Sequence, residues 1–199
     1  MSKIFRYVII FFLAISFGNI TTSAQDITVK NGQFLLNGKP YYFIGANYWY
    51  GGLLALVKDP VHGKERLKKE LDFLKSKGVN NLRVLAGSEG KGKVNGVDRV
   101  RPALQPEQGI FNQEVLQGLD YLLSEMSKRK MYAVLYLSNN WEWSGGFLQY
   151  LNWNKQLTDL AMAPKMNWDT QRDYTSKFYS CEPCINDYNI QLNYIIKHV

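Results

Sequence analysis

The chain has 199 residues, of which 46% are hydrophobic and 14% aromatic, and its formal net charge at pH 7 is +7. This composition argues against a disordered chain and is sufficient for one compact domain with a sizeable core. Much of the basic excess lies in residues 64–77, where it is interleaved with Glu65, Glu70 and Asp72, as on a solvated helix face. We therefore do not expect a nucleic-acid-binding protein.

Residues 1–24 have the layout of a secretory signal peptide. Lys3 and Arg6 precede an apolar core from Tyr7 to Phe17, and small residues end the segment at Ala24. No segment approaches the roughly 20 consecutive apolar residues that a membrane-spanning helix needs. We expect cleavage after Ala24, secretion or export to a periplasm, and no membrane contact for the mature protein.

Two Asn-Gly pairs follow the signal peptide. Residues 27–29 and 34–36 are short apolar runs on either side of Asn31-Gly32, and Asn37-Gly38 comes directly after the second run. Asn-Gly is the preferred pair in two-residue hairpin turns. The sequence therefore predicts an N-terminal β-hairpin, followed by a first core strand over residues 41–46.

Helical and strand patterns then alternate along the chain. Leucines recur at helical spacing over residues 65–77, and residues 81–86 form a second predicted strand. Asn112 is a suitable N-cap for a helix over residues 113–130. Residues 131–137 are almost continuously apolar, as in a parallel strand covered on both faces. The expected buried positions of the second helix are Val115, Leu116, Leu119, Leu122, Leu123 and Met126.

This alternation of strands and helices predicts an α/β fold with about three βα units. The predicted strands start near residues 42, 81 and 131, a spacing that suits an α/β barrel with elaborated loops. An open doubly wound sheet remains an alternative, although no G-x-G-x-x-G motif begins a helix after these strands. Residues 138–183 show no helical pattern but many aromatic residues, which predicts a functional loop. A third covering helix is expected over residues 185–198.

Cys181 and Cys184 are the only cysteines, in a C-x-x-C pattern. In an exported chain this pattern indicates a local disulfide or two buried thiols with a structural role. A closed zinc site needs four ligands, and the only histidines are His62 and His198. We predict no metal site and no organic cofactor.

Side chains suited to sugars follow the first and third predicted strands. Amide groups match sugar hydroxyls, and flat aromatic rings match the C–H faces of a sugar ring. In a β/α barrel the carboxyl ends of all strands open on one face, so the sequence predicts a saccharide cleft there. The candidate substrate-binding residues are Asn47, Trp49, Tyr50, Arg83, Asn140, Trp141 and Trp143.

Arg83 lies in the second predicted strand. Because side chains alternate along a strand, it shares a face with Leu85, opposite Leu82 and Val84. We expect its guanidinium to meet an apolar interior, where it would need a carboxylate partner from a later strand. The alternative is an arginine that extends to the strand end and binds backbone carbonyls.

Glu89 and Glu142 are the acidic residues in strand-end loops that could form a glycosidase pair. Such pairs lie roughly 5 Å apart in retaining enzymes and 6.5–9.5 Å apart in inverting enzymes. Glu89 lies among glycines on a loop that we expect to be exposed, and Glu142 between tryptophans suits a subsite wall, so we do not favour this pair. A serine triad is less favoured still, because no G-x-S-x-G occurs and neither histidine follows a strand.

Four segments together resemble the family 5 glycoside hydrolases of clan A, most closely the endo-β-1,4-mannanases. The resemblance implies a (β/α)₈ TIM barrel, of which this chain holds about the first three βα units. It also implies cleavage of internal β-1,4 linkages in mannan, glucomannan or galactomannan with retention, through a glycosyl-enzyme intermediate. The four segments are Ile44-Gly45-Ala46-Asn47, Leu82-Arg83-Val84, Gln117-Gly118-Leu119-Asp120 and Asn139-Asn140-Trp141 with Gly145-Gly146.

In this family the acid/base glutamate lies in an Asn-Glu-Pro motif after the fourth strand, and the nucleophilic glutamate follows the seventh. The chain has no Asn-Glu-Pro, so we expect both glutamates beyond residue 199, with residues 25–199 forming an incomplete, inactive part of the catalytic barrel. The resemblance places Arg83 near the missing nucleophile and makes Trp49-Tyr50 and Asn140-Trp141 sugar contacts. The alternatives are a β-1,4-glucanase of the same clan and a non-catalytic secreted carbohydrate-binding protein.

Overall fold

The computed structural model describes residues 27–94, 96–157 and 167–199. The predicted signal peptide, residues 1–24, lies outside these ranges. The chain divides into two compact units, Met1–Tyr42 and Phe43–Val199.

The first unit contains a three-stranded antiparallel sheet. Its strands are β1 (Ile27–Lys30), β2 (Gln33–Leu36) and β3 (Lys39–Pro40), in the order β1-β2-β3. Both turn residues between β1 and β2 have positive φ, 51° at Asn31 and 73° at Gly32. Positive φ at both central residues is the type I′ geometry that the Asn-Gly pair predicts. The predicted N-terminal hairpin is confirmed.

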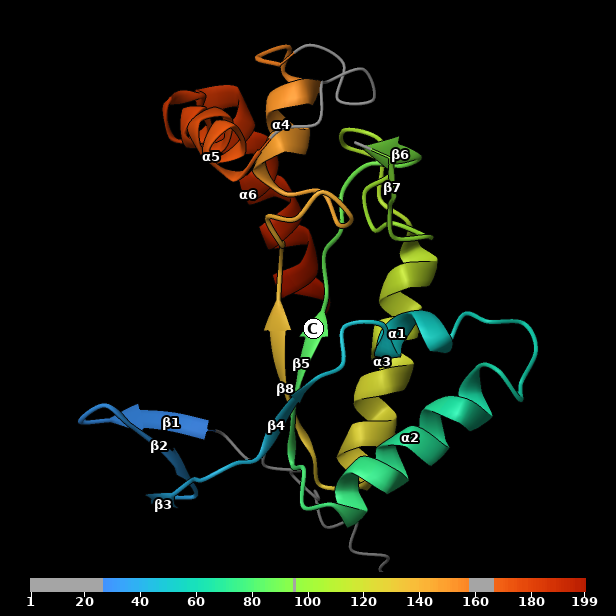
Figure 1. Ribbon diagram of the computed structural model, residues 1–199. Helices are drawn as coiled ribbons and strands as arrows, with labels where there is room; N and C mark the ends of the chain where they lie inside the picture. Colours follow the sequence, from blue (N-terminus) through green and yellow to red (C-terminus); the bar gives the residue numbers. More distant parts are fainter. Residues whose placement is uncertain (1–26, 95, 158–166) are drawn as a thin grey trace, which may run out of the picture. The chain divides into compact units, whose positions relative to one another are not determined.

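The second unit is built on a parallel sheet of three strands. They are β4 (Gly45–Asn47), β5 (Asn81–Leu85) and β8 (Tyr132–Tyr136), in the order β4-β5-β8. Their carboxyl ends point the same way, towards the small hairpin of β6 (Lys93–Val94) and β7 (Val97–Asp98) (Figure 1). The first core strand is shorter than the predicted residues 41–46.

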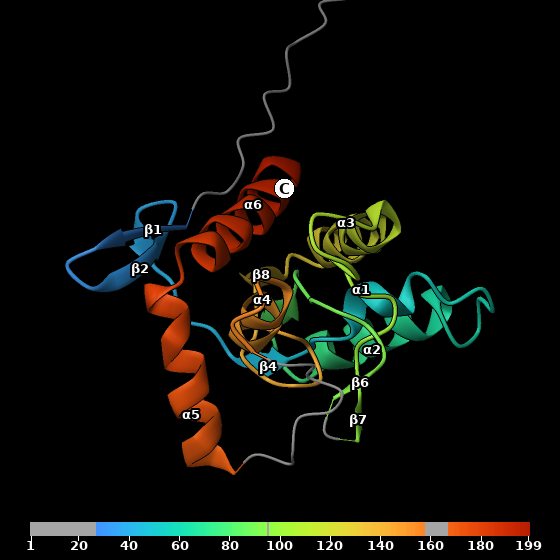
Figure 2. The same cartoon turned by 90° about the horizontal axis from the view of Figure 1, so that it is seen from above.

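Helices cover one face of this parallel sheet. Leu82 and Val84 of β5 are fully buried in one core with leucines of α2 (Lys64–Ser76) and α3 (Gln113–Lys128). The short helix α1 (Gly51–Leu54) packs against α3, and both lie on the same side of the sheet as α2 (Figures 1 and 2). The helices predicted over residues 65–77 and 113–130 are confirmed to within two residues. Asn112 is the N-cap of α3, because its side chain accepts a hydrogen bond of 3.0 Å from Glu114 N.

Residues 138–183 contain helices, so the prediction of a loop without helices was wrong. The segment includes α4 (Phe147–Trp153), α5 (Trp168–Ser176) and a 3-10 turn, η1 (Lys177–Ser180), before α6 (Glu182–His198). Residues 148–151 of α4 are all buried, which removes the helical period on which amphipathic patterns depend. Helix α5 is mostly polar and gives an equally weak pattern.

Cys181 and Cys184 form a disulfide at the start of α6. The disulfide packs in a second core with Tyr150, Leu151 and Phe178, where the rings of Phe147 and Phe178 stack at 3.9 Å. The expected structural role of the cysteines therefore takes the form of a disulfide. Among the described residues no group of His, Cys, Asp and Glu could hold a metal ion, and no described helix is long and apolar enough to cross a bilayer.

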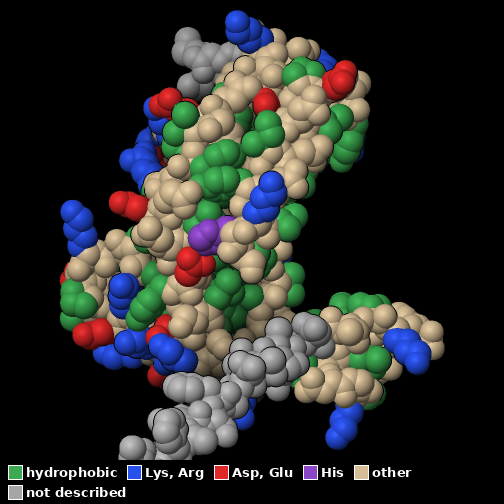
Figure 3. All heavy atoms as spheres, turned by 180° about the vertical axis from the view of Figure 1, so that it is seen from behind, with side chains coloured by type: hydrophobic (Ala, Val, Ile, Leu, Met, Phe, Trp, Pro, Cys, Tyr) green, Lys and Arg blue, Asp and Glu red, His purple; other side chains and the backbone are tan. Residues whose placement is uncertain are grey.

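Charged side chains of both signs are interspersed over the face shown in Figure 3. One ion-pair network joins α2 to the end of α3: the Arg129 Nε atom lies 2.7 Å from Asp72 Oδ1, and its Nη1 atom lies 2.8 Å from Glu125 Oε2. Lys128 Nζ also donates to Glu125, at 2.6 Å. Hydrogen bonds from Lys128 and Arg129 hold the pKa of the buried Glu125 carboxyl below its usual range.

We expect Glu125 to contribute to the acid sensitivity of folding. Its pKa is lower in the folded than in the unfolded chain, so its stabilisation is present above the unfolded value of about 4.3 and is lost as pH falls through the folded value. Glu125→Gln should therefore lower the melting temperature at pH 7 but much less at pH 3. Thermal unfolding across this range checks it, with the exposed Glu114→Gln as control. A deficit that does not change with pH would contradict the assignment.

Candidate functional site

Aromatic residues after β4 and β8 meet at the carboxyl end of the sheet. The ring of Trp49 lies 4.9 Å from that of Trp143 and 5.6 Å from that of Tyr50, centre to centre. These three rings, Trp49, Tyr50 and Trp143, form what we term the aromatic rim. The structure thus brings together residues that the sequence places almost a hundred positions apart, and confirms that both strand ends contribute to one surface.

Glu70 of α2 holds the β4 side of the aromatic rim. Its Oε2 atom accepts hydrogen bonds from the hydroxyls of Tyr48 at 2.7 Å and Tyr50 at 3.2 Å, and Oε1 accepts from Arg66 Nε at 2.6 Å. Burial raises the pKa of Glu70, but these hydrogen bonds outweigh it and keep the pKa below its usual range. The sequence assigned Glu70 to a solvated helix face, because nothing in the pattern of α2 shows that two tyrosines reach it.

The β8 loop, residues 138–146, carries the remaining predicted sugar contacts. Trp141 is 49% exposed and Asn140 is also exposed. The Asn140 side-chain oxygen accepts a hydrogen bond of 3.1 Å from Phe147 N, so this asparagine also fixes the start of α4. The backbone oxygen of Trp143 accepts from Val100 N at 2.8 Å, which ties the loop to the segment after β7.

Arg83 is exposed in the described part of the chain, so the apolar surroundings expected for it are not seen there. The alternation along β5 is as expected, but the helix-covered core is on the Leu82 side, and Arg83 is exposed on the other face. No described carboxylate forms an ion pair with it. Its guanidinium instead lies 3.6 Å from the ring centre of Tyr136. Asn47 is its register partner on β4 and shares this exposed face. A role for Arg83 beside a nucleophile remains a prediction.

Glu89 is buried, with 1% of its surface exposed, so the expectation of an exposed loop was wrong. Four donors surround its carboxylate: Ser138 Oγ at 2.9 Å, Gly146 N at 2.9 Å, Tyr150 Oη at 3.2 Å and Gln191 Nε2 at 2.5 Å. Burial raises the pKa of the Glu89 carboxyl, although all four donors favour the ionised form. A group so enclosed cannot reach a glycosidic oxygen, which excludes Glu89 and Glu142 as a catalytic pair.

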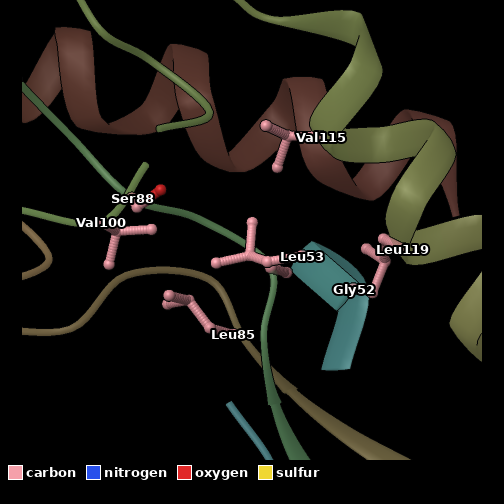
Figure 4. Close-up of a pocket in the computed structure, with 8 residues that line it drawn as sticks. Gly52, Leu53, Leu85, Ser88, Val100, Val115 and Leu119 are labelled. Carbon is pink, nitrogen blue, oxygen red and sulfur yellow. The ribbon is translucent and has the colours of Figure 1, made fainter. Parts of the chain in front are cut away.

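A small pocket lies between α1, α3 and the end of β5 (Figure 4). Figure 4 shows Ser88 as the polar member of an otherwise apolar lining, and its hydroxyl accepts a hydrogen bond of 3.1 Å from Leu104 N. A lining of this kind offers a sugar almost no hydrogen-bond partners. The candidate site is therefore the aromatic rim with the β8 loop. The pocket is lined by Gly52, Leu53, Leu85, Ala86, Ser88, Val100, Val115 and Leu119.

Known proteins resemble this chain over most of its length. Mannan endo-1,4-beta-mannosidase 7 of Arabidopsis thaliana is 32% identical over 132 residues, which are 66% of this chain and 28% of that protein. Mannan endo-1,4-beta-mannosidase 1 of Solanum lycopersicum is 34% identical over 128 residues, which are 64% of this chain and 29% of that protein. The chain thus spans less than a third of the length of these relatives.

A solved structure agrees with these relatives. The Glycoside Hydrolase Family 5 Mannosidase from Rhizomucor miehei, in complex with mannosyl-fructose, is 34% identical and superposes with a TM-score of 0.69. The superposition covers 83% of this chain and 39% of that one. Residues 24–199 also match the family described as GH family 5 beta-mannosidase-like. This match spans the β4, β5 and β8 segments and the aromatic rim, so the chain belongs to glycoside hydrolase family 5, in its β-mannosidase-like group.

Proposed function

We propose that residues 25–199 form the N-terminal part of a secreted endo-β-1,4-mannanase with a (β/α)₈ barrel. The observation that carries this proposal is the aromatic rim at the carboxyl end of a parallel sheet, where Trp49 and Trp143 lie 4.9 Å apart. Aromatic faces of this kind suit the apolar side of a sugar ring. The names of the relatives favour mannan as the polymer, and we include glucomannan and galactomannan because their backbones also contain β-1,4-linked mannose.

The proposed reaction is hydrolysis with retention, in which one glutamate acts as general acid/base and another as nucleophile. We place both glutamates beyond residue 199, and the burial of Glu89 supports this placement. No metal or organic cofactor takes part in this proposal. Secretion predicts that the exported protein begins at Gln25, which N-terminal sequencing of the mature protein would check.

Hydrolysis assays on the protein encoded by the complete gene test this proposal. Reducing ends should appear rapidly with glucomannan and mannan, and the initial products should be oligosaccharides of mixed length. Carboxymethylcellulose should be hydrolysed much more slowly. The reverse preference would assign a β-1,4-glucanase, and hydrolysis of mannan by the 199-residue chain alone would contradict the placement of the catalytic glutamates.

A second candidate is a carbohydrate-binding protein without catalytic activity. Two observations favour it. The described residues form an aromatic rim that could bind a sugar, and the Glu89 carboxylate is too enclosed to act on one. Mannan retardation of the protein in affinity electrophoresis, together with no reducing-end release by the complete gene product, would support this candidate over the enzyme.

We expect Trp141 to contribute directly to mannan binding. Its ring is half exposed in the β8 loop, and a well-placed aromatic contact is worth about 0.5–1.5 kcal/mol, so Trp141→Ala should weaken binding roughly three- to tenfold. Affinity electrophoresis on glucomannan measures the change. Tyr179, in the η1 turn, is 73% exposed and serves as the control, because Tyr179→Ala removes a more exposed aromatic ring that lies outside both the aromatic rim and the β8 loop. Equal effects of the two substitutions would contradict a specific role for Trp141.

A further inference from the structure

Glu89 connects the two ends of the β8 loop. One carboxylate oxygen accepts a hydrogen bond from Ser138 at the start of the loop, and the other accepts from the backbone of Gly146 at its end, both at 2.9 Å. The backbone of Glu89 adds a third link, because its N–H donates to Ser144 O at 2.8 Å. The loop is therefore fixed at both ends by one buried residue.

A chain of side-chain amides requires an acceptor at position 89. Gly109 N donates to Gln105 Oε1 at 3.2 Å, Gln105 Nε2 donates to Gln191 Oε1 at 3.1 Å, and Gln191 Nε2 donates to Glu89. The backbone N–H of Gly109 sets the direction of this chain, because it can only donate. A carboxylate ends the chain with acceptors on both oxygens. A glutamine at position 89 would place its NH₂ group against the Gly146 N–H or against Gln191 Nε2, both of which are donors. Reversing the chain of amides would not remove the conflict, because the Gly109 N–H at its other end can only donate.

Glu89 also packs closely against the end of the β8 loop. A Cβ atom at Gly145 would lie 2.6 Å from the Glu89 Cβ, O and Oε2 atoms. The Arg99 guanidinium, itself buried, donates to the backbone oxygen of Glu89 and to Gln149 Oε1, the latter at 2.8 Å. Glu89 thus lies under the β8 loop and out of reach of a polymer substrate.

We propose that Glu89 is a positioning residue that holds the β8 loop so that Trp141 and Trp143 present their rings to the saccharide. Trp143 meets Trp49 only if the loop keeps its place, since no residue of the loop belongs to the parallel sheet. This inference rests on the proposed function for the identity of the ligand. The loop geometry that it invokes does not depend on that function.

Hydrogen–deuterium exchange on the intact, ligand-free protein tests the positioning. In Glu89→Gln, amides of the β8 loop, residues 138–146, should exchange at least tenfold faster, while those of α3, residues 113–128, should be unchanged. Glucomannan affinity should fall by a similar factor. Glu107→Gln is the control, because Glu107 also lies between β5 and α3 but is exposed and pairs with Lys91 at the surface. If the β8-loop amides exchange at the same rate in Glu89→Gln as in Glu107→Gln, the proposal is overturned.

A second pair of variants decides the question if Glu89→Gln does not fold. Ser138→Ala and Tyr150→Phe each remove one hydroxyl donor to the same Glu89 oxygen, but only Ser138 lies in the β8 loop. We expect faster loop exchange and weaker glucomannan binding in Ser138→Ala, with smaller changes in Tyr150→Phe. Equal effects would reduce Glu89 to a general stabiliser of the core and overturn the proposal. If the unaltered protein does not bind glucomannan at all, the proposed function fails, and the exchange data still decide whether Glu89 positions the loop.

Discussion

Replacing Gly87 by alanine should lower the free energy of unfolding by about 3 kcal/mol, near the upper end of the range for overpacked sites. A Cβ atom at this position would lie 2.0 Å from Leu137 O and 2.9 Å from Gln191 Nε2. The first of these is a backbone atom of the residue that follows β8, so the overlap cannot be relieved by turning a side chain. The strand ends that carry Glu89 and the β8 loop would have to separate.

Gly45→Ala is the matched control for this substitution. Gly45 also lies at a core strand, in β4, and a Cβ atom there would be 3.6 Å from Asn81 O, which is ordinary contact. We expect Gly45→Ala to be neutral or slightly stabilising, since alanine restricts the unfolded chain more than glycine does. Thermal unfolding measures both variants, and the Gly87→Ala melting temperature should be lower by roughly 10 °C. Similar melting temperatures for the two variants would contradict the close approach.

The parts of the fold that could be predicted from the sequence are those with a strong apolar pattern. The leucine face of α3 gave a helix close to the observed bounds, because one covered face leaves a clear period. Residues 131–137 gave a strand close to the observed bounds through their continuous apolar run instead. Helix α4 gave no such pattern, because four consecutive residues are buried between neighbouring elements. Asn167 is the signal that could have located α5, since it accepts a hydrogen bond from Thr170 N at 2.9 Å as an N-cap.

The candidate site was predictable in its exposed residues and not in its buried ones. Trp49, Tyr50 and Trp143 were identified by residue type and position after strands, and they do meet. Glu89 was misjudged because glycines on both sides usually mark an exposed loop. Here a side chain at Gly90 would overlap Arg99 Nη1 at 2.0 Å, so the glycine reflects close packing. For Arg83, alternation along β5 gives two faces but does not say which one the helices cover, and a carboxylate partner from a later strand stays a prediction.

Gly118→Ala should destabilise the protein by about 2 kcal/mol, although helix propensity alone predicts a gain of about 1 kcal/mol from this change inside a helix. Gly118 lies within α3, where a Cβ atom would be 2.5 Å from Gly52 O, a backbone atom of α1. Helix α1 follows directly after Tyr50, so moving it away from α3 also moves the β4 side of the aromatic rim. We therefore expect weaker glucomannan binding together with the lower stability.

Gly52→Ala probes the same contact from the opposite side. Its Cβ atom would lie 3.4 Å from the Leu119 backbone, which α1 can tolerate, so stability should change by less than about 0.5 kcal/mol. Denaturant unfolding gives the free energies, and affinity electrophoresis gives the binding. A stabilised Gly118→Ala variant would show that helix propensity outweighs the α1–α3 contact. It would also show that Tyr50 keeps its place in the aromatic rim without the close approach of Gly118 to Gly52 O. If Gly118→Ala is destabilised but binds glucomannan as before, the α1–α3 packing supports the fold without setting the position of the aromatic rim.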